Sequence, residues 1–251
     1  VRMNRINTLV TVWNHWDGIG PCAPDYPSDL ELRAAIPAGV NLAFLEPGQR
    51  LAEQLAGVEV LYGPLPEADF DRADCLRWVQ LNSTGADSMA YRAFADSGIA
   101  LTTLGGAITT TVAEHALALL FALARNLHLQ RDAQRERRWN AACGVDLRGL
   151  TLGLLGFGRI GRAIAERAGG FGMNILAVDA HPRDQPDGVA TLAGLDFLPQ
   201  MLERSNALIC SLPKTPTTWR LIAAEQLERM PRGSFIVNVG RGGVIDEAAL
   251  V

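Results

Sequence analysis

A short glycine-rich turn constrains the fold of this chain more than any other feature. Residues 151–179 read TLGLLGFGRIGRAIAERAGGFGMNILAVD. Gly156, Gly158 and Gly161 follow an apolar run typical of a buried strand and open a helical pattern. A second apolar run then ends on Asp179. A strand, a glycine turn, a helix and an acidic strand end are together the pattern of a dinucleotide-binding unit.

Each of these residues meets a different physical need. Gly156 lets the chain turn sharply out of the strand, Gly158 leaves room for a pyrophosphate, and Gly161 lets helix and strand pack closely. The phosphates then lie at the helix N-terminus, where free N–H groups favour negative charge. Asp179 can accept hydrogen bonds from ribose hydroxyls and would repel a 2′-phosphate, so it predicts NAD rather than NADP, although Arg183 could soften that preference. A glycine-rich turn with a structural Asp is the alternative.

Short β-branched runs alternate with helical patterns along the rest of the chain, which favours an α/β fold with parallel sheets. The strands expected first are 7–13, 40–46, 58–63, 78–83 and 100–105, with helices at 48–56 and 86–95. A long helix at 111–126 precedes strands at 151–156, 174–179, 189–192, 207–211 and 234–239, with helices from 160, at 195–204 and at 223–230. We therefore expect two doubly wound domains, 1–104 and 105–251, the second incomplete at its C-terminal end.

Composition excludes some classes of function. Lys plus Arg is 23 and Asp plus Glu is 27, so the net charge of −4 argues against a nucleic-acid or anionic-membrane binder. No apolar run is long enough for a membrane span, and no secretory leader opens the sequence. The four widely spaced cysteines, which indicate reduced, buried thiols and a cytoplasmic protein, are Cys22, Cys75, Cys143 and Cys210. The first residue, Val1, and the abrupt end are expected for a partial chain.

Five blocks, in this order, resemble the D-2-hydroxyacid dehydrogenases, the family of phosphoglycerate dehydrogenases and glyoxylate/hydroxypyruvate reductases. The blocks are WVQLNSTGADSM, TTTVAEHALALLFALARNL, the glycine segment, ICSLPKTPTTWRLI and SFIVNVGRGGVIDEAAL. The resemblance covers about residues 75–251. It implies a flavodoxin-like substrate domain, a Rossmann NAD-binding domain, and hydride transfer between nicotinamide and C2 of a 2-hydroxy or 2-oxo acid.

The resemblance also implies roles for individual residues. Arg241 matches the family's catalytic arginine, which binds the substrate carboxylate beside the carbonyl, and a guanidinium fork with fixed positive charge suits that task. Substrate contacts are implied for Ser83, Thr84, Gly85 and Arg241. Cofactor contacts are implied for Thr84, Gly156, Gly158, Arg159, Ile160, Gly161, Asp179, Leu212, Pro213, Val239 and Gly240. The alternatives are a loop arginine bonded to nearby carbonyls and an ordinary turn at 83–87. Lys214 stands where the family usually has an apolar residue.

The family's proton-donating pair, a Glu and a His, lies downstream of the arginine block, and the sequence ends before either. None of the four histidines, His15, His115, His128 and His181, resembles the catalytic one, and His115 is expected to pack or cap. We expect no metal and only slow turnover by the 251-residue chain.

Two other classes of function stay open. The first is a non-catalytic protein of this fold that binds or senses NAD, or an inactive fragment. The second is a Rossmann enzyme with other chemistry, such as a methyltransferase or flavoprotein. The charged run 130–139 is either a solvated helix face or loop, or the rim of a homodimer interface through 111–139. The apolar helix before it is either a core helix or an interface helix.

Overall fold

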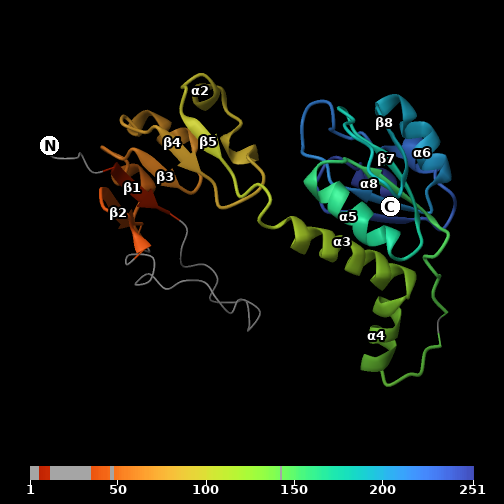
Figure 1. Cartoon of the computed structure of the whole chain (residues 1–251). Helices are drawn as coiled ribbons and strands as arrows, with labels where there is room; N and C mark the ends of the chain where they lie inside the picture. Colours follow the sequence, from red (N-terminus) through yellow and green to blue (C-terminus); the bar gives the residue numbers. More distant parts are fainter. Residues whose placement is uncertain (1–5, 12–34, 46–47, 142) are drawn as a thin grey trace. The chain divides into compact units, whose positions relative to one another are not determined.

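The computed structural model describes residues 6–11, 35–45, 48–141 and 143–251 (Figure 1). The chain divides into two compact units, Val1–Gly106 and Ala107–Val251. Each unit is built on a parallel sheet of five strands, so the predicted α/β fold class is confirmed. The ends of the predicted strands at 7–13 and 40–46, together with His15 and Cys22, lie partly or wholly outside the described residues.

The first unit has the strand order β2-β1-β3-β4-β5. Its strands are β1 (Ile6–Val10), β2 (Val40–Phe44), β3 (Val60–Tyr62), β4 (Trp78–Gln80) and β5 (Ala100–Thr102). Because side chains alternate along a strand, Leu9, Leu61 and Val79 face the same way, and all three are buried in one apolar cluster. The segments after β3 and β4 cover this cluster, and Leu65 and Phe94 supply its buried side chains there.

Two predicted helical segments of the first unit are only partly helical. The segment 48–56 contains only one short 3₁₀ turn, η1 (Leu51–Glu53), because Gly48 and Gly57 bound it with positive φ angles of 89° and 71°. The segment 86–95 divides into η3 (Asp87–Met89) and the single-turn helix α2 (Arg92–Ala95). A further 3₁₀ segment, η2 (Glu67–Arg72), lies between β3 and β4.

The second unit has the strand order β10-β9-β6-β7-β8. Its strands are β6 (Thr151–Leu155), β7 (Asn174–Val178), β8 (Val189–Ala193), β9 (Ala207–Cys210) and β10 (Phe235–Asn238). The order reverses at β6, because the chain passes from β6 to β7 and β8 on one side and to β9 and β10 on the other. This reversal is a topological switch point, the usual ligand site of an open α/β sheet.

Helices cover both faces of this sheet. Successive residues of β6 divide between the two faces: Leu154 joins a cluster with α3 (Thr109–Ala124) and α5 (Arg159–Gly169). Leu155 joins the opposite cluster, which includes Met201 of α6 (Leu198–Arg204) and the segment before α7 (Ala224–Glu228). The remaining elements are α4 (Leu127–Arg135), η4 (Leu195–Phe197) and α8 (Glu247–Leu250). No described helix has the length and apolar character needed to cross a membrane.

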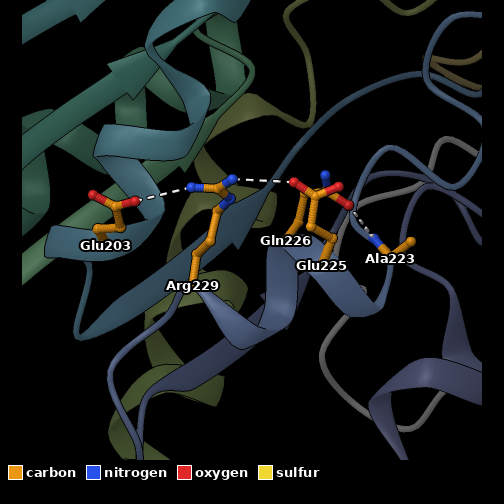
Figure 2. Close-up of polar contacts among 5 residues, drawn as sticks. All are labelled: Glu203, Ala223, Glu225, Gln226 and Arg229. Carbon is orange, nitrogen blue, oxygen red and sulfur yellow. Dashed lines mark hydrogen bonds and ion pairs between the residues drawn. The ribbon is translucent and has the colours of Figure 1, made fainter.

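An arginine connects α6 to α7 on the second of these faces (Figure 2). Arg229 donates from Nη1 to Glu203 Oε1 at 3.0 Å and from Nη2 to Glu225 Oε1 at 3.1 Å. Hydrogen bonds to Glu225 and then Glu203 raise the pKa of Arg229. The Ala223 N–H donates to Gln226 Oε1 at 3.2 Å at the start of α7. These partly exposed pairs orient α7 more than they stabilise the fold.

The cysteine prediction is correct for one described residue and wrong for two. Cys210 is buried at the end of β9, and burial raises the pKa of its thiol. Cys75 and Cys143 are exposed, because both lie in connections outside the apolar clusters. All three are free thiols.

Candidate functional site

The glycine turn joins the end of β6 to the start of α5 at the switch point. Gly156 has a φ angle of 95°, which few residues other than glycine adopt, and it turns the chain out of β6. A Cβ at Gly161 would lie 2.2 Å from the Gly156 carbonyl oxygen, so α5 presses directly on the turn. A Cβ at Gly158 would meet no described atom within 4 Å. Gly158 is therefore the glycine that faces open space.

The N-terminus of α5 is open to an anion. Gly158 is its N-cap residue, and no side chain of the described residues caps its first N–H groups. Arg159, the first helical residue, is exposed, whereas Ile160 packs against the α3–α5 cluster. Free N–H groups, the helix dipole and a nearby guanidinium all favour a negatively charged group at this point.

Asp179 follows β7 and is held against the glycine turn. Its Oδ2 accepts a hydrogen bond from Phe157 N at 2.7 Å, and its Oδ1 accepts one from His181 N at 2.9 Å. Each carboxylate oxygen has a second lone pair, so the group can accept further hydrogen bonds from a ligand. The two backbone contacts fix the direction in which the carboxylate points.

The loops after β9 and β10 meet the glycine turn at the same edge of the sheet. Leu155, Cys210 and Asn238 are in register across β6, β9 and β10, so the three loops start at one level. Ser211 Oγ donates to the Gly156 carbonyl at 3.1 Å. A Cβ at Gly240 would lie 2.5 Å from the Leu212 carbonyl oxygen. The structure therefore brings the predicted residues after β6, β9 and β10 together.

Arg241 lies in the loop after β10 and is partly buried. Its Nη1 donates to the Gly240 carbonyl at 3.3 Å, and its own carbonyl accepts from Asn238 Nδ2 at 3.1 Å. Asn238 Oδ1 also accepts from Gly240 N at 3.0 Å. The Asn238 side chain thus clamps the backbone on both sides of Gly240 and holds the loop that presents Arg241.

The predicted substrate loop lies in the first unit, after β4. Ser83 Oγ donates to the Gly85 carbonyl at 2.7 Å, and the Ser83 carbonyl accepts from Leu104 N at 3.0 Å. Within the described part of the chain, Thr84 Oγ1 is a buried side-chain atom without a hydrogen-bond partner. Such a hydroxyl costs free energy unless a ligand or water satisfies it.

Sequence reasoning missed Asn238 and Ser211, which hold these loops. The available signal was a polar residue at the end of an apolar run, the position that both residues share. The expectation that His115 packs or caps is wrong. His115 is exposed on α3 and, with Asn238 and Val239, lines a cavity of about 440 Å³. No group of three or more His, Cys, Asp or Glu side chains could hold a metal ion among the described residues.

Comparison with known proteins identifies the family. Residues 117–251 match the model described as D-isomer specific 2-hydroxyacid dehydrogenase, NAD binding domain. The chain belongs to the D-isomer specific 2-hydroxyacid dehydrogenase family. The resemblance in the sequence is therefore confirmed, and NAD is the cofactor of this NAD-binding domain.

Several known proteins are similar to this chain. A glyoxylate reductase from Korarchaeum cryptofilum is 36% identical over 210 residues, which are 80% of this chain and 62% of that protein. The structure of a glyoxylate reductase from Paecilomyes thermophila matches with a TM-score of 0.81 and 26% identity, over 99% of this chain and 77% of that one. The structure of a D-isomer specific 2-hydroxyacid dehydrogenase from Xanthobacter autotrophicus Py2, in complex with NADPH and MES, matches with a TM-score of 0.75 and 29% identity. The match covers 97% of this chain and 75% of that one.

The chain thus spans less than two thirds of the length of the first curated relative. Its own residues nevertheless fit an NAD molecule. The open side of Gly158 and the uncapped start of α5 suit a pyrophosphate, and the anchored carboxylate of Asp179 suits ribose hydroxyls. The fit rests on the geometry of this unit alone.

We predict that Gly158→Ala weakens NADH binding by at least about tenfold, or about 1.4 kcal/mol, because the new methyl group occupies the pyrophosphate position. Gly158 has a negative φ of −75°, so alanine is not strained there. The matched control is Gly169→Ala in α5, where an added Cβ also meets no described atom within 4 Å. Fluorescence titration measures the NADH affinity of both variants, and thermal unfolding measures their stability. Equal NADH affinity of both variants would contradict the placement of the phosphates.

Proposed function

We propose that this chain is an NAD-dependent oxidoreductase that transfers a hydride between nicotinamide and C2 of a 2-hydroxy or 2-oxo acid. In this proposal residues 1–104 are the substrate domain and 105–251 the NAD-binding domain. The observation that carries it is the position of Arg241, in a loop clamped by Asn238 beside the residues that meet the glycine turn.

Arg241 binds the substrate carboxylate in this proposal. A guanidinium donates two parallel hydrogen bonds to a carboxylate, which orients the acid as well as attracting it. The same positive charge lies beside the C2 oxygen and stabilises the negative charge that develops there on reduction. Arg241 is partly buried, so water screens this charge less than on an exposed loop.

The loop at 83–85 supplies the second set of substrate contacts. Thr84 Oγ1 is buried and has no partner within the described residues, so a substrate or cofactor oxygen would satisfy it. The hydrogen bond from Ser83 Oγ to the Gly85 carbonyl fixes the turn that presents this hydroxyl. Backbone N–H groups of the turn are donors that suit a carboxylate.

The cofactor contacts follow from the loops at the switch point. Gly156 and Gly161 shape the turn, and Gly158 leaves room for the pyrophosphate. Arg159 and Ile160 cover the pyrophosphate, and Asp179 accepts hydrogen bonds from the ribose. Leu212 and Pro213 pack on the adenosine side, whereas Val239, Gly240 and Thr84 lie by the nicotinamide.

The test of this function removes the arginine. We predict that Arg241→Gln lowers kcat/KM for glyoxylate, hydroxypyruvate and pyruvate by about 100-fold or more, because one charged donor set at the developing oxyanion is lost. The measurement is NADH oxidation, together with calorimetric titration of oxalate into the NADH-bound chain. Arg204→Gln, which removes an exposed arginine of α6, is the matched control and should change neither.

The same experiment decides between the two main candidate functions. Loss of oxalate binding and of turnover in Arg241→Gln supports the dehydrogenase. Tight NADH binding with no reduction of any of the three acids supports a protein that binds or senses NAD, or an inactive fragment. An Arg241→Gln variant that matches the parent chain in both measurements would overturn the proposed role of the arginine.

We also predict that the chain binds NADH at least about tenfold more tightly than NADPH, because Asp179 and a 2′-phosphate carry like charges. The readout is the ratio of the two affinities in the parent chain and in Asp179→Asn. The amide keeps an oxygen for the Phe157 N–H and removes the charge, so the ratio should fall toward one. Equal affinities in the parent chain would contradict the assignment.

The protein forms a homodimer through residues 111–139 in this proposal. The exposed apolar side chains of Leu127 and Leu129 on α4, 49% and 46% exposed, support it. Trp139, just after α4, is 94% exposed. Leu127 and Trp139 line one surface hollow beside α4, and exposed apolar side chains on one surface are typical of surfaces that associate.

We predict that Leu129→Asp converts the dimer to a monomer in sedimentation velocity, because a charge placed in an apolar interface is costly to desolvate. Leu195→Asp is the matched control, since Leu195 is 42% exposed in η4, outside the 111–139 region. A parent chain that sediments as a monomer at all concentrations would contradict the dimer.

A further inference from the structure

Trp219 packs on the loop that carries Arg241. A Cβ built at Gly243 would lie 2.1 Å from Cζ3 of Trp219, and its three nearest atoms all belong to that ring. The indole therefore lies directly against the Gly243 backbone, two residues after Arg241. Gly243 has a φ angle of 82°, so no other residue type fits there without strain, even without the ring.

The backbone of the Trp219 segment pairs with the same loop. Arg220 N donates to the Gly243 carbonyl at 2.7 Å, and Ile222 N donates to the Val244 carbonyl at 3.1 Å. Asp246 N donates back to the Ile222 carbonyl at 2.8 Å. Ile222 and Val244 are both fully buried. This pairing fixes the downstream end of the Arg241 loop, while Asn238 fixes the upstream end.

Two adjacent glycines lie between Arg241 and the downstream anchor. Glycine has more backbone freedom than any other residue, so this pair is the natural hinge of the loop. A Cβ at Gly242 would meet no described atom within 4 Å. The movement of Gly243 is thus limited by the ring of Trp219 and by the hydrogen bond that its carbonyl accepts from Arg220 N.

Two cations hold the indole in place. Lys214 Nζ lies 4.6 Å from the ring centroid and Arg220 Cζ lies 5.8 Å from it, both within the range of cation–π attraction. Arg220 is fixed in turn, since its Nε lies 3.6 Å from Asp246 Oδ2. The ring is 49% exposed, so these contacts rather than burial in a core determine its place. Lys214, unusual for the family at this position, has a local partner.

We propose that Trp219, held by Lys214, is a positioning residue that keeps the Arg241 loop in the conformation that binds a carboxylate. The proposal rests on the role of Arg241 proposed above. Trp219 itself touches the loop backbone and acts only through the arginine. Its contribution is preorganisation: a loop fixed before binding loses less freedom when the carboxylate arrives.

The test is calorimetric titration of oxalate into the NADH-bound chain. Trp219→Ala should weaken oxalate binding by about 3- to 10-fold, because the Arg241 side chain and its loop would then lose their freedom only when oxalate binds. NADH affinity should stay within about twofold of the parent value, because the glycine turn and Asp179 are untouched. Trp219→Phe keeps a ring over Gly243 and should restore most of the affinity. Lys214→Met removes the positive charge but keeps a side chain of similar length, and it should weaken oxalate binding by about 2- to 3-fold.

A matched control separates this role from a general loss of packing. Phe171→Ala removes another ring, 46% exposed and in edge contact with Phe121, from the same unit. It should lower the thermal midpoint without changing oxalate affinity. If Trp219→Ala is too unstable to titrate, the Trp219→Phe and Lys214→Met pair carries the test.

Comparison of the two single variants distinguishes failure of this proposal from failure of the proposed function. Oxalate binding lost in Arg241→Gln but unchanged in Trp219→Ala overturns the positioning role alone. Oxalate binding unchanged in Arg241→Gln overturns the proposed function and the positioning role together.

Discussion

The contact between Gly161 and the Gly156 carbonyl is the constraint on which the rest of the site depends. It places the start of α5 directly over the end of β6, closer than any side chain would allow. The start of this helix then lies at the edge of the sheet where the loops after β9 and β10 also begin. The positions of the proposed cofactor-binding residues in this unit therefore depend on the contact between Gly161 and Gly156.

Hydrogen bonds between loops convert this edge into a defined surface. Asp179 is bonded to the glycine turn, Ser211 to the Gly156 carbonyl, and Asn238 to both sides of Gly240. Each bond joins a loop to its neighbour or to itself, so the loops are ordered before any ligand binds. Preorganised polar groups of this kind lower the cost of binding and of developing charge.

The sequence predicts the second unit well and the first unit less well, for physical reasons. The expected strands at 151–156 and 207–211 differ from β6 and β9 by one residue, because buried parallel strands are continuous apolar runs. The expected helix at 48–56 fails because two glycines with positive φ leave it too short. Short elements depend on their tertiary surroundings more than on a repeating pattern.

The residues of the candidate site also differ in how far the sequence predicts them. The glycine turn and Asp179 are adjacent in the sequence, so their spacing predicts their grouping. The contact of Trp219 with Gly243 joins residues 24 positions apart in two loops, and no periodic pattern marks it. The exposure of His115 likewise depends on which face of α3 packs on the sheet. The binding roles of the individual residues stay predictions.

The central claim is hydride transfer to C2 of a 2-oxo acid, and its most direct test follows the hydride itself. NADH deuterated on the nicotinamide ring is incubated with excess chain and either glyoxylate or hydroxypyruvate, and the acid product is analysed by mass spectrometry. The account predicts deuterium at C2 of the 2-hydroxy acid, and formation of this product at least about 100-fold more slowly when the Arg241→Gln variant is used under the same conditions. Bound NADH with no deuterium at C2 after prolonged incubation would contradict it.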